Sequence, residues 1–285
     1  MPVEPPVVSP RTLDDAFAVL ASGPHRPVAG GTDLLVQITG EIGDPPERVI
    51  DLWGLDELRG ISAANGTLVI GALATYTDIR RSPDVARHLP ALAEAAATIG
   101  AAQIQNRGTL GGNAANASPA GDTLPILLAT DAELELGGPR GARMVAAAEF
   151  WPSYRRPALA ADELILRIRF PLVEDRQVRF RKVGTRRAQA ISKVVMALAW
   201  QARDSVDEWH DVRLALGSMA PTPVRALRTE ALLEGAAPTQ EIADAAVAML
   251  GDEFTPIDDV RSTADYRRAV AGRVLHRLIR DEGDW

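Results

Sequence analysis

Two glycine-rich stretches decide how this chain folds and what it can bind. Residues 28–34 read Val-Ala-Gly-Gly-Thr-Asp-Leu, and residues 109–122 read Thr-Leu-Gly-Gly-Asn-Ala-Ala-Asn-Ala-Ser-Pro-Ala-Gly-Asp. Each stretch places two adjacent glycines at a predicted turn, where the missing side chains let backbone N–H groups converge on an anion. A diphosphate carries two charged groups, so two such stretches can hold it from opposite sides.

Both stretches also have a purely structural interpretation. One glycine pair between a strand and a helix is more often a tight turn than a binding site. The second stretch is harder to explain in this way, because a long polar segment is costly to order without a ligand. The residues alone leave a nucleotide site and two structural turns open. The Rossmann fingerprint G-x-G-x-x-G and the P-loop are both absent from the sequence.

The segments around the first stretch predict a small βαβ unit. Apolar side chains recur at helical spacing over residues 12–21, and short strands are predicted over residues 26–29 and 48–52. Further along, Asn65-Gly66 is typical of a type I′ hairpin turn, because both central residues of that turn need positive φ.

The rest of the chain predicts an α/β region followed by a sheet with helices. Helices are predicted over residues 75–81 and 91–99, and residues 108–125 are expected to have little or broken helix. A hairpin is predicted to turn at Gly137-Gly138-Pro139. Later strands are predicted over residues 163–170, 177–183, 192–202 and 212–218, and later helices over residues 241–250 and 266–278.

Composition restricts the chemistry. The 285 residues include no cysteine, which excludes disulfides, thiolate-bound metals and cysteine nucleophiles, so redox chemistry needs a borrowed cofactor. The net charge of −7 argues against a general nucleic-acid partner. The four histidines lack ligand partners at metal spacing, so no metal site is expected. Neither a signal peptide nor a membrane span is apparent, which predicts a cytoplasmic location.

The two stretches together resemble the double signature of the FAD-binding subunits of molybdenum hydroxylases, the family of xanthine dehydrogenase and aerobic carbon monoxide dehydrogenase. The resemblance extends over nearly the whole chain and includes Phe180-Arg181-Lys182, the segment Arg186–Ser192 and the segment Ala264–Arg267. The segment Arg186–Ile191 contains no tyrosine. In this respect the chain resembles the xanthine dehydrogenase branch more than the carbon monoxide dehydrogenase branch.

The resemblance implies an α+β fold. Residues 1–172 would form an FAD-binding domain of the vanillyl-alcohol-oxidase (PCMH) type, with α/β subdomains at about 1–55 and 56–172. Residues 177–281 would form a domain with a three-stranded antiparallel sheet and helices, and Pro171 marks the boundary.

The resemblance also implies which residues hold FAD. Backbone amides from the two stretches would surround the diphosphate, Asp122 would hold ribityl or ribose hydroxyls, and Ile165 would meet the adenine through its backbone. Ile99 would pack against the isoalloxazine ring, and Lys182 is the candidate catalytic residue, because a cation there stabilises the reduced, anionic flavin. By itself, Lys182 has the alternative interpretation of a solvated strand face. The implied cofactor-binding residues are Val28, Ala29, Gly30, Gly31, Thr32, Asp33, Leu34, Ile99, Thr109, Gly111, Gly112, Asn113, Asn116, Ser118, Asp122, Ile165 and Lys182.

By the same resemblance, the chain would carry electrons between subunits. A small [2Fe–2S] subunit would deliver electrons from a large molybdenum-cofactor subunit, in a dimer of heterotrimers, and NAD+ or oxygen would accept them. Two alternatives stay open: a self-sufficient flavin oxidase or dehydrogenase of the same fold, and an assembly protein that has lost FAD.

Overall fold

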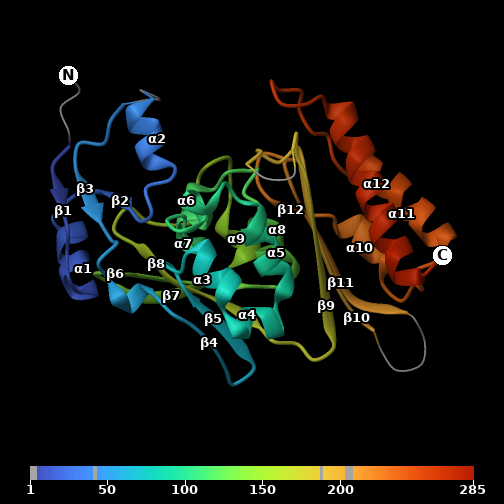
Figure 1. The fold of residues 1–285 in the computed structure, drawn as a ribbon, viewed down its shortest axis with the longest axis horizontal. Coiled ribbons are helices and arrows are strands. Elements are labelled where there is room, and N and C mark those ends of the chain that lie inside the picture. Colours follow the sequence, from blue (N-terminus) through green and yellow to red (C-terminus); the bar gives the residue numbers. More distant parts are fainter. Residues whose placement is uncertain (1–4, 41–43, 187–188, 203–207) are drawn as a thin grey trace.

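Three β-sheets organise the chain in the computed structural model, which describes residues 5–40, 44–186, 189–202 and 208–285 (Figure 1). Their strand orders are β1-β3-β2, β4-β5-β8-β6-β7 and β12-β11-β10-β9. In Figure 1 the three sheets follow one another across the molecule, from the N-terminal sheet on the left to the C-terminal sheet on the right.

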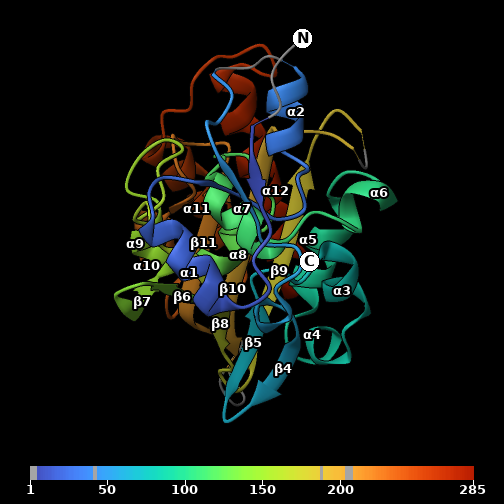
Figure 2. The same ribbon diagram turned by 90° about the vertical axis from the view of Figure 1, so that its left-hand side faces the viewer.

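The first sheet belongs to a small N-terminal unit. The unit comprises β1 (Val7–Val8), α1 (Leu13–Ala21), β2 (Arg26–Val28), α2 (Leu34–Thr39) and β3 (Val49–Asp51). Both β1 and β2 pair with β3 in parallel, so the predicted βαβ unit is confirmed. Thr12 caps α1 through its hydroxyl, and Ala16 and Leu20 on the inner face of this helix pack against Ile50. Figure 2 shows this unit in front of the second sheet.

The second sheet carries most of the helices of the N-terminal half. Its elements are the 3₁₀ helix Asp56–Leu58, β4 (Ile61–Ala64), β5 (Thr67–Gly71), α3 (Tyr76–Arg81), α4 (Pro83–His88), α5 (Pro90–Thr98), α6 (Ala102–Gln105), α7 (Leu110–Asn116), α8 (Leu124–Ala129), β6 (Glu133–Gly138), β7 (Gly141–Ala146), α9 (Ala147–Phe150) and β8 (Leu164–Pro171). Asn65 and Gly66 have φ values of 50° and 72°, as the predicted hairpin requires.

Two sequence predictions in this region are confirmed in part. The helix over residues 108–125 is broken, as expected, because α7 ends at Asn116 and α8 begins only at Leu124. Tertiary packing lets α7 form despite the low helix propensity of its two glycines. The predicted hairpin is present, but Gly137 and Gly138 lie inside β6, and Pro139 and Arg140 form the turn between the paired residues Gly138 and Gly141. Gly141, directly after the turn, has a φ of 101°, and the two earlier glycines pack against β8 and the segment before it.

The third sheet forms the C-terminal part of the chain. Its strands are β9 (Arg176–Val183), β10 (Val194–Ala202), β11 (Trp209–Gly217) and β12 (Val224–Arg225), and its helices are α10 (Leu227–Leu233), α11 (Gln240–Glu253) and α12 (Ala264–Gly283). The three long strands are antiparallel, as predicted, and the two-residue β12 adds a short fourth strand.

Strand β10 is buried on both of its faces. Val195, Ala197 and Ala199 belong to the core shared with α5 and α8, whereas Met196 and Leu198 belong to the core under α11 and α12. Successive side chains of a strand point to opposite faces, so one nine-residue strand contributes to two cores. The third sheet is therefore packed between the N-terminal helices and its own helices, as Figure 1 shows.

A buried arginine joins α12 to the ends of β10 and β11. The Arg267 guanidinium donates to the carbonyl of Lys193 at 2.9 Å, to the carbonyl of Ser218 at 3.0 Å and to Asp259 at 2.8 Å. Its side chain is only 4% exposed, so these partners take the place of water at the two terminal nitrogens, whereas the buried Nε has no partner among the described residues. This arginine lies in the segment Ala264–Arg267, which is one of the segments that carry the family resemblance.

We expect Arg267→Gln to lower the free energy of unfolding by about 3 kcal/mol, because it removes one partner of a buried ion pair. Arg268→Gln is the matched control, since the ion pair of Arg268 within the described residues is with the exposed Asp265 and should contribute less than about 1 kcal/mol. Urea unfolding of both variants measures the difference. Equal losses in the two variants would show that the buried contacts of Arg267 contribute nothing special.

Candidate functional site

The two glycine-rich stretches meet in space although they lie far apart in the sequence. The Asn116 side-chain amide donates to Asp33 Oδ1 at 3.0 Å, and Arg107 Nε donates to the Gly30 carbonyl at 3.4 Å. A Cβ atom on Gly30 would lie 1.7 Å from the carbonyl oxygen of Arg107. Only glycine permits this approach, so the Gly30 position fixes how closely the two stretches pack.

The first stretch presents free backbone donors. Within the described part of the chain, the N–H groups of Gly30, Gly31, Thr32 and Asp33 have no hydrogen-bond partner. Gly31 has a φ of 77°, in the left-handed region that favours glycine. Consecutive free N–H groups in such a turn form an anion-binding concavity, which fits the phosphate role that the resemblance implies for residues 28–34.

The second stretch uses its amides differently from our expectation. Four of its backbone N–H groups are already bonded within the protein: Leu110 to the Ala74 carbonyl, Gly111 to the Ala72 carbonyl, and Gly112 and Asn113 to Thr109. The first turn of α7 packs directly on residues 72–74, and a Cβ on Gly111 would lie 2.7 Å from the Ala72 carbonyl oxygen. The expectation that residues 109–113 offer a run of free amides is therefore wrong for this structure.

Polar side chains of the second stretch remain in position beside the first. Asn113 is half-buried and accepts from the Thr123 hydroxyl at 2.6 Å, which leaves its NH₂ group to donate elsewhere. The Thr109 hydroxyl accepts from the Gly112 N–H and keeps its own proton for donation. Ser118 follows the left-handed Ala117 that ends α7, and its hydroxyl oxygen accepts from Ala120 at 3.3 Å.

The end of the second stretch reaches the C-terminal sheet. The Pro119 carbonyl accepts from the Ser218 N–H at 2.8 Å. Lys182 Nζ, on β9, donates to Asp122 Oδ2 at 2.6 Å and to the Thr98 carbonyl at 3.2 Å. The Ser192 hydroxyl donates to the other oxygen of Asp122. Residues from four separate segments, Thr98, Asp122, Lys182 and Ser192, thus form one polar cluster between the two halves of the chain.

This cluster is buried. The side chains of Lys182 and Asp122 are 5% and 9% exposed, so the alternative that Lys182 lies on a solvated strand face is wrong. Burial raises the pKa of Asp122 above its ordinary value, although the charge of Lys182 and the hydrogen bonds from Lys182 and Ser192 act in the opposite direction. Nearby, burial, with smaller effects from Asp122 and Asp33, raises the pKa of Tyr76.

Ile99 packs against the hydrophobic core that contains Ile165. Ile99 ends α5 and is half-buried, and its carbonyl accepts from Gln105 at 3.0 Å. Ile165 is buried on β8, and its neighbours Leu164 and Leu166 share a core with Ala29 of the first stretch. The structure therefore brings the strand of Ile165 next to the first stretch.

Two contributors to this region were missed in the sequence. The Arg107 guanidinium lies 3.7 Å from the centre of the Trp53 ring, and that of Arg59 lies 4.5 Å from it, so Trp53 helps to hold the arginine that contacts Gly30. Ser192 lies in the segment Arg186–Ser192, and nothing in its local pattern indicates a contact with Asp122. The two residues are 70 positions apart in the sequence and meet only in the folded chain.

Known proteins match the chain over almost its whole length. Residues 2–173 match the family described as the FAD-binding domain in molybdopterin dehydrogenase, and residues 179–281 match the carbon monoxide dehydrogenase flavoprotein C-terminal domain. The carbon monoxide dehydrogenase medium chain of Hydrogenophaga pseudoflava is 34% identical over 95% of this chain and 94% of its own length. The xanthine dehydrogenase FAD-binding subunit of Escherichia coli O157:H7 is 33% identical over 94% and 92%.

A solved structure agrees with these matches. The Hydrogenophaga pseudoflava carbon monoxide dehydrogenase structure superposes with a TM-score of 0.91 at 33% identity, and covers 97% of this chain and 96% of that one. The protein is a flavoprotein of the oxidoreductase class. It belongs to the family of FAD-binding medium subunits of molybdenum hydroxylases. Both branches match at similar identity, so assignment to the xanthine dehydrogenase branch stays a prediction.

The described residues contain no group of three or more histidine, cysteine, aspartate or glutamate side chains placed to hold a metal ion. None of their helices is long and apolar enough to cross a membrane.

Gly30→Ala tests the contact between the two stretches. The added Cβ would overlap the Arg107 carbonyl, so we expect the free energy of unfolding to fall by about 1–3 kcal/mol and bound FAD to be lost. Gly251→Ala is the control, because Gly251 lies in α11 with open space around it and should gain up to about 1 kcal/mol. A Gly30→Ala protein that keeps its stability and its flavin absorbance would contradict the close contact.

The raised pKa of Asp122 predicts a pH dependence. The unfolded value is about 3.9, so just above that pH the native state binds more protons than the unfolded state. The stability that Asp122 contributes is therefore present at low pH and is lost as the pH rises through the folded pKa. We expect the unfolding free energy of the native chain, minus that of Asp122→Asn, to fall as the pH rises from about 4 to 7. Urea unfolding at stepped pH measures this difference, and a rising difference would contradict it.

Proposed function

We propose that this chain transfers electrons through bound FAD, taking them from [2Fe–2S] clusters of a partner subunit and passing them to an external acceptor. The observation that carries the proposal is the convergence of the free amides of residues 30–33, the polar side chains of the second stretch and the buried Lys182 on one region. The family membership supports FAD as the cofactor.

Residues of this chain would hold FAD as follows. The N–H groups of Gly30–Asp33 would donate to the diphosphate, and the Thr109 and Asn113 side chains would donate from the other stretch. The remaining residues of the two stretches would shape the surface around it through close packing rather than through free amides. Asp122 would accept from sugar or ribityl hydroxyls, in partial exchange for Ser192 or Lys182.

FAD supplies the ability to accept electrons singly and to deliver one or two. The role of Lys182 would be electrostatic. A buried ammonium group beside the ring system favours the more negatively charged, reduced form of the cofactor. Ile99 would exclude water from one side of the ring.

Partner subunits would supply the metals. The chain lacks cysteine, so it cannot ligate an ordinary iron–sulfur cluster by itself. We propose a small [2Fe–2S] subunit and a large molybdenum subunit in a dimer of heterotrimers, because the matched relatives include the medium chain of a carbon monoxide dehydrogenase. NAD+ or oxygen would be the final acceptor.

The competing function is a self-sufficient flavin oxidase or dehydrogenase. It requires a base beside the flavin and a substrate cavity in this chain. Lys182 is a poor candidate base, because it is already bonded to Asp122 and to the Thr98 carbonyl. An absorbance spectrum of the purified chain, before and after addition of FAD, tests cofactor binding first. Bleaching of the flavin band by NADH, but not by organic substrates of molybdenum hydroxylases, would then favour the electron-transfer subunit.

Lys182→Gln tests the electrostatic role. Loss of the buried charge should lower the midpoint potential of the bound flavin by roughly 20–50 mV, since 30 mV is about 1.4 kcal/mol for a two-electron couple. Lys193→Gln is the control, because Lys193 lies against the Tyr266 ring and outside the cluster. Spectroelectrochemical titration of the three proteins measures the potentials. An unchanged potential in Lys182→Gln would remove Lys182 from the catalytic role.

A further inference from the structure

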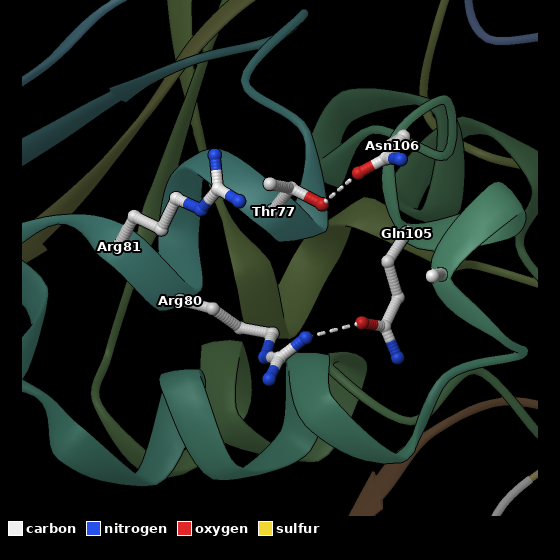
Figure 3. A pocket seen from close by; sticks show the side chains of 6 residues that line it. Thr77, Arg80, Arg81, Gln105 and Asn106 are labelled. Atoms are coloured by element: carbon white, nitrogen blue, oxygen red, sulfur yellow. Dashed lines mark hydrogen bonds between the residues drawn. The ribbon is translucent and has the colours of Figure 1, made fainter.

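A hollow with two arginines lies apart from the stretches described above. It has a volume of about 270 Å³ and lies between the last turn of α3 and the end of α6 (Figure 3). Its lining residues are Thr77, Arg80, Arg81, Ala102, Gln105 and Asn106. It is smaller than the roughly 300–1,000 Å³ of pockets that enclose whole small-molecule ligands, so it suits one charged group.

The free polar groups of this hollow are mainly donors. Its two amide oxygens are both occupied: Gln105 Oε1 accepts from Arg80, and Asn106 Oδ1 accepts from the Thr77 hydroxyl at 2.6 Å. Figure 3 shows both hydrogen bonds. Among the described residues, the remaining N–H groups of Arg80 and Arg81 and the Asn106 NH₂ group have no other hydrogen-bond acceptor.

The charge of the hollow is not balanced by a carboxylate among its lining residues. In the described part of the chain neither Arg80 nor Arg81 forms an ion pair. Asp78 of the same helix accepts from the N–H and hydroxyl groups of Thr75 at the opposite end of α3. The whole chain carries a net charge of −7, so the positive charge of this hollow does not follow from the overall composition.

One wall of the hollow is held rigidly. Gln105 is 5% exposed, and its NH₂ group donates to the carbonyls of Ala97 and Ile99. Its oxygen accepts from Arg80, so a single buried side chain connects the hollow to the end of α5. Rigid support of this kind is typical of built sites, because it removes the entropy cost of ordering the donors when a ligand binds.

We propose that this hollow binds a phosphate group, either as a free phosphate or diphosphate or as the phosphate of a nucleotide. Guanidinium groups present forked N–H donors that match phosphate oxygens, and charge-assisted hydrogen bonds of this type are the strong ones. The phosphate site itself goes beyond the proposed electron-transfer role. The further idea that a nucleotide acting as electron acceptor places its phosphate here, beside the Gln105 side chain that contacts Ile99, rests on that role.

Calorimetric titration of the FAD-loaded full chain with inorganic pyrophosphate at low ionic strength tests the proposal. Loading with FAD prevents pyrophosphate from binding at the cofactor's own amides. We expect saturable binding that Arg81→Gln weakens at least about tenfold, the equivalent of one charge-assisted hydrogen bond. Arg81→Lys should weaken it less, because it keeps the charge and loses the fork. Arg87→Gln, an exposed arginine of α4 outside the hollow, should leave it unchanged.

NAD+ separates the two sources of phosphate. Competition by NAD+ with pyrophosphate, lost in Arg81→Gln, identifies a dinucleotide, whereas pyrophosphate binding without competition identifies a free anion. Absence of saturable pyrophosphate binding, or equal affinity in Arg81→Gln and the unmodified chain, would overturn the proposal. All variants should keep their flavin absorbance. If the chain holds no FAD, pyrophosphate is titrated into Gly30→Ala, which alters the first glycine-rich stretch, and into Arg81→Gln, which alters the hollow. Only Arg81→Gln should then lose pyrophosphate binding to the hollow.

Discussion

The double burial of β10 is the constraint on which the rest of the structure depends. This strand fills the core under α11 and α12 with one set of side chains and the core shared with α5 and α8 with the other. Two consecutive cores joined by one strand cannot slide past each other without exposing apolar surface on both sides. Strand β9 pairs with β10 along its length, so the position of Lys182 relative to α5 and Asp122 is fixed by hydrophobic packing.

Glycine has two different roles in the paired stretches. In the first stretch, Gly31 supplies a backbone conformation with positive φ, and neighbouring amides stay free. In the second stretch, Gly111 supplies closeness, because α7 lies directly on the backbone of residues 72–74. Gly30 also supplies closeness, at the point of contact with Arg107, and its own N–H stays free. The two stretches look alike as sequences, yet only one of them is organised as a nest of donors.

This difference also marks how far the sequence could predict the structure. Strong local signals were sufficient for the βαβ unit, the Asn65-Gly66 hairpin and the three long C-terminal strands, because each depends on periodicity or on turn chemistry. The helix over residues 110–116 could not be predicted from local signals, since it depends on packing against Ala72 and on the Thr109 cap. The contacts of Ser192 with Asp122 and of Trp53 with Arg107 could not be predicted from the sequence either, because each joins segments that only the fold brings together.

The Lys182–Asp122 pair explains why a charged cluster can persist between two apolar cores. Burial of either charge alone would be strongly unfavourable, and one ion pair rarely compensates fully for desolvation. Here the Thr98 carbonyl and the Ser192 hydroxyl satisfy further hydrogen bonds of the pair. The residual cost is visible in the raised pKa of Asp122, whose burial outweighs the favourable charge of Lys182. A carboxylate whose desolvation is incompletely compensated exchanges one hydrogen-bond partner for another at lower cost than a fully compensated one, and this is the property that the proposed role of Asp122 requires.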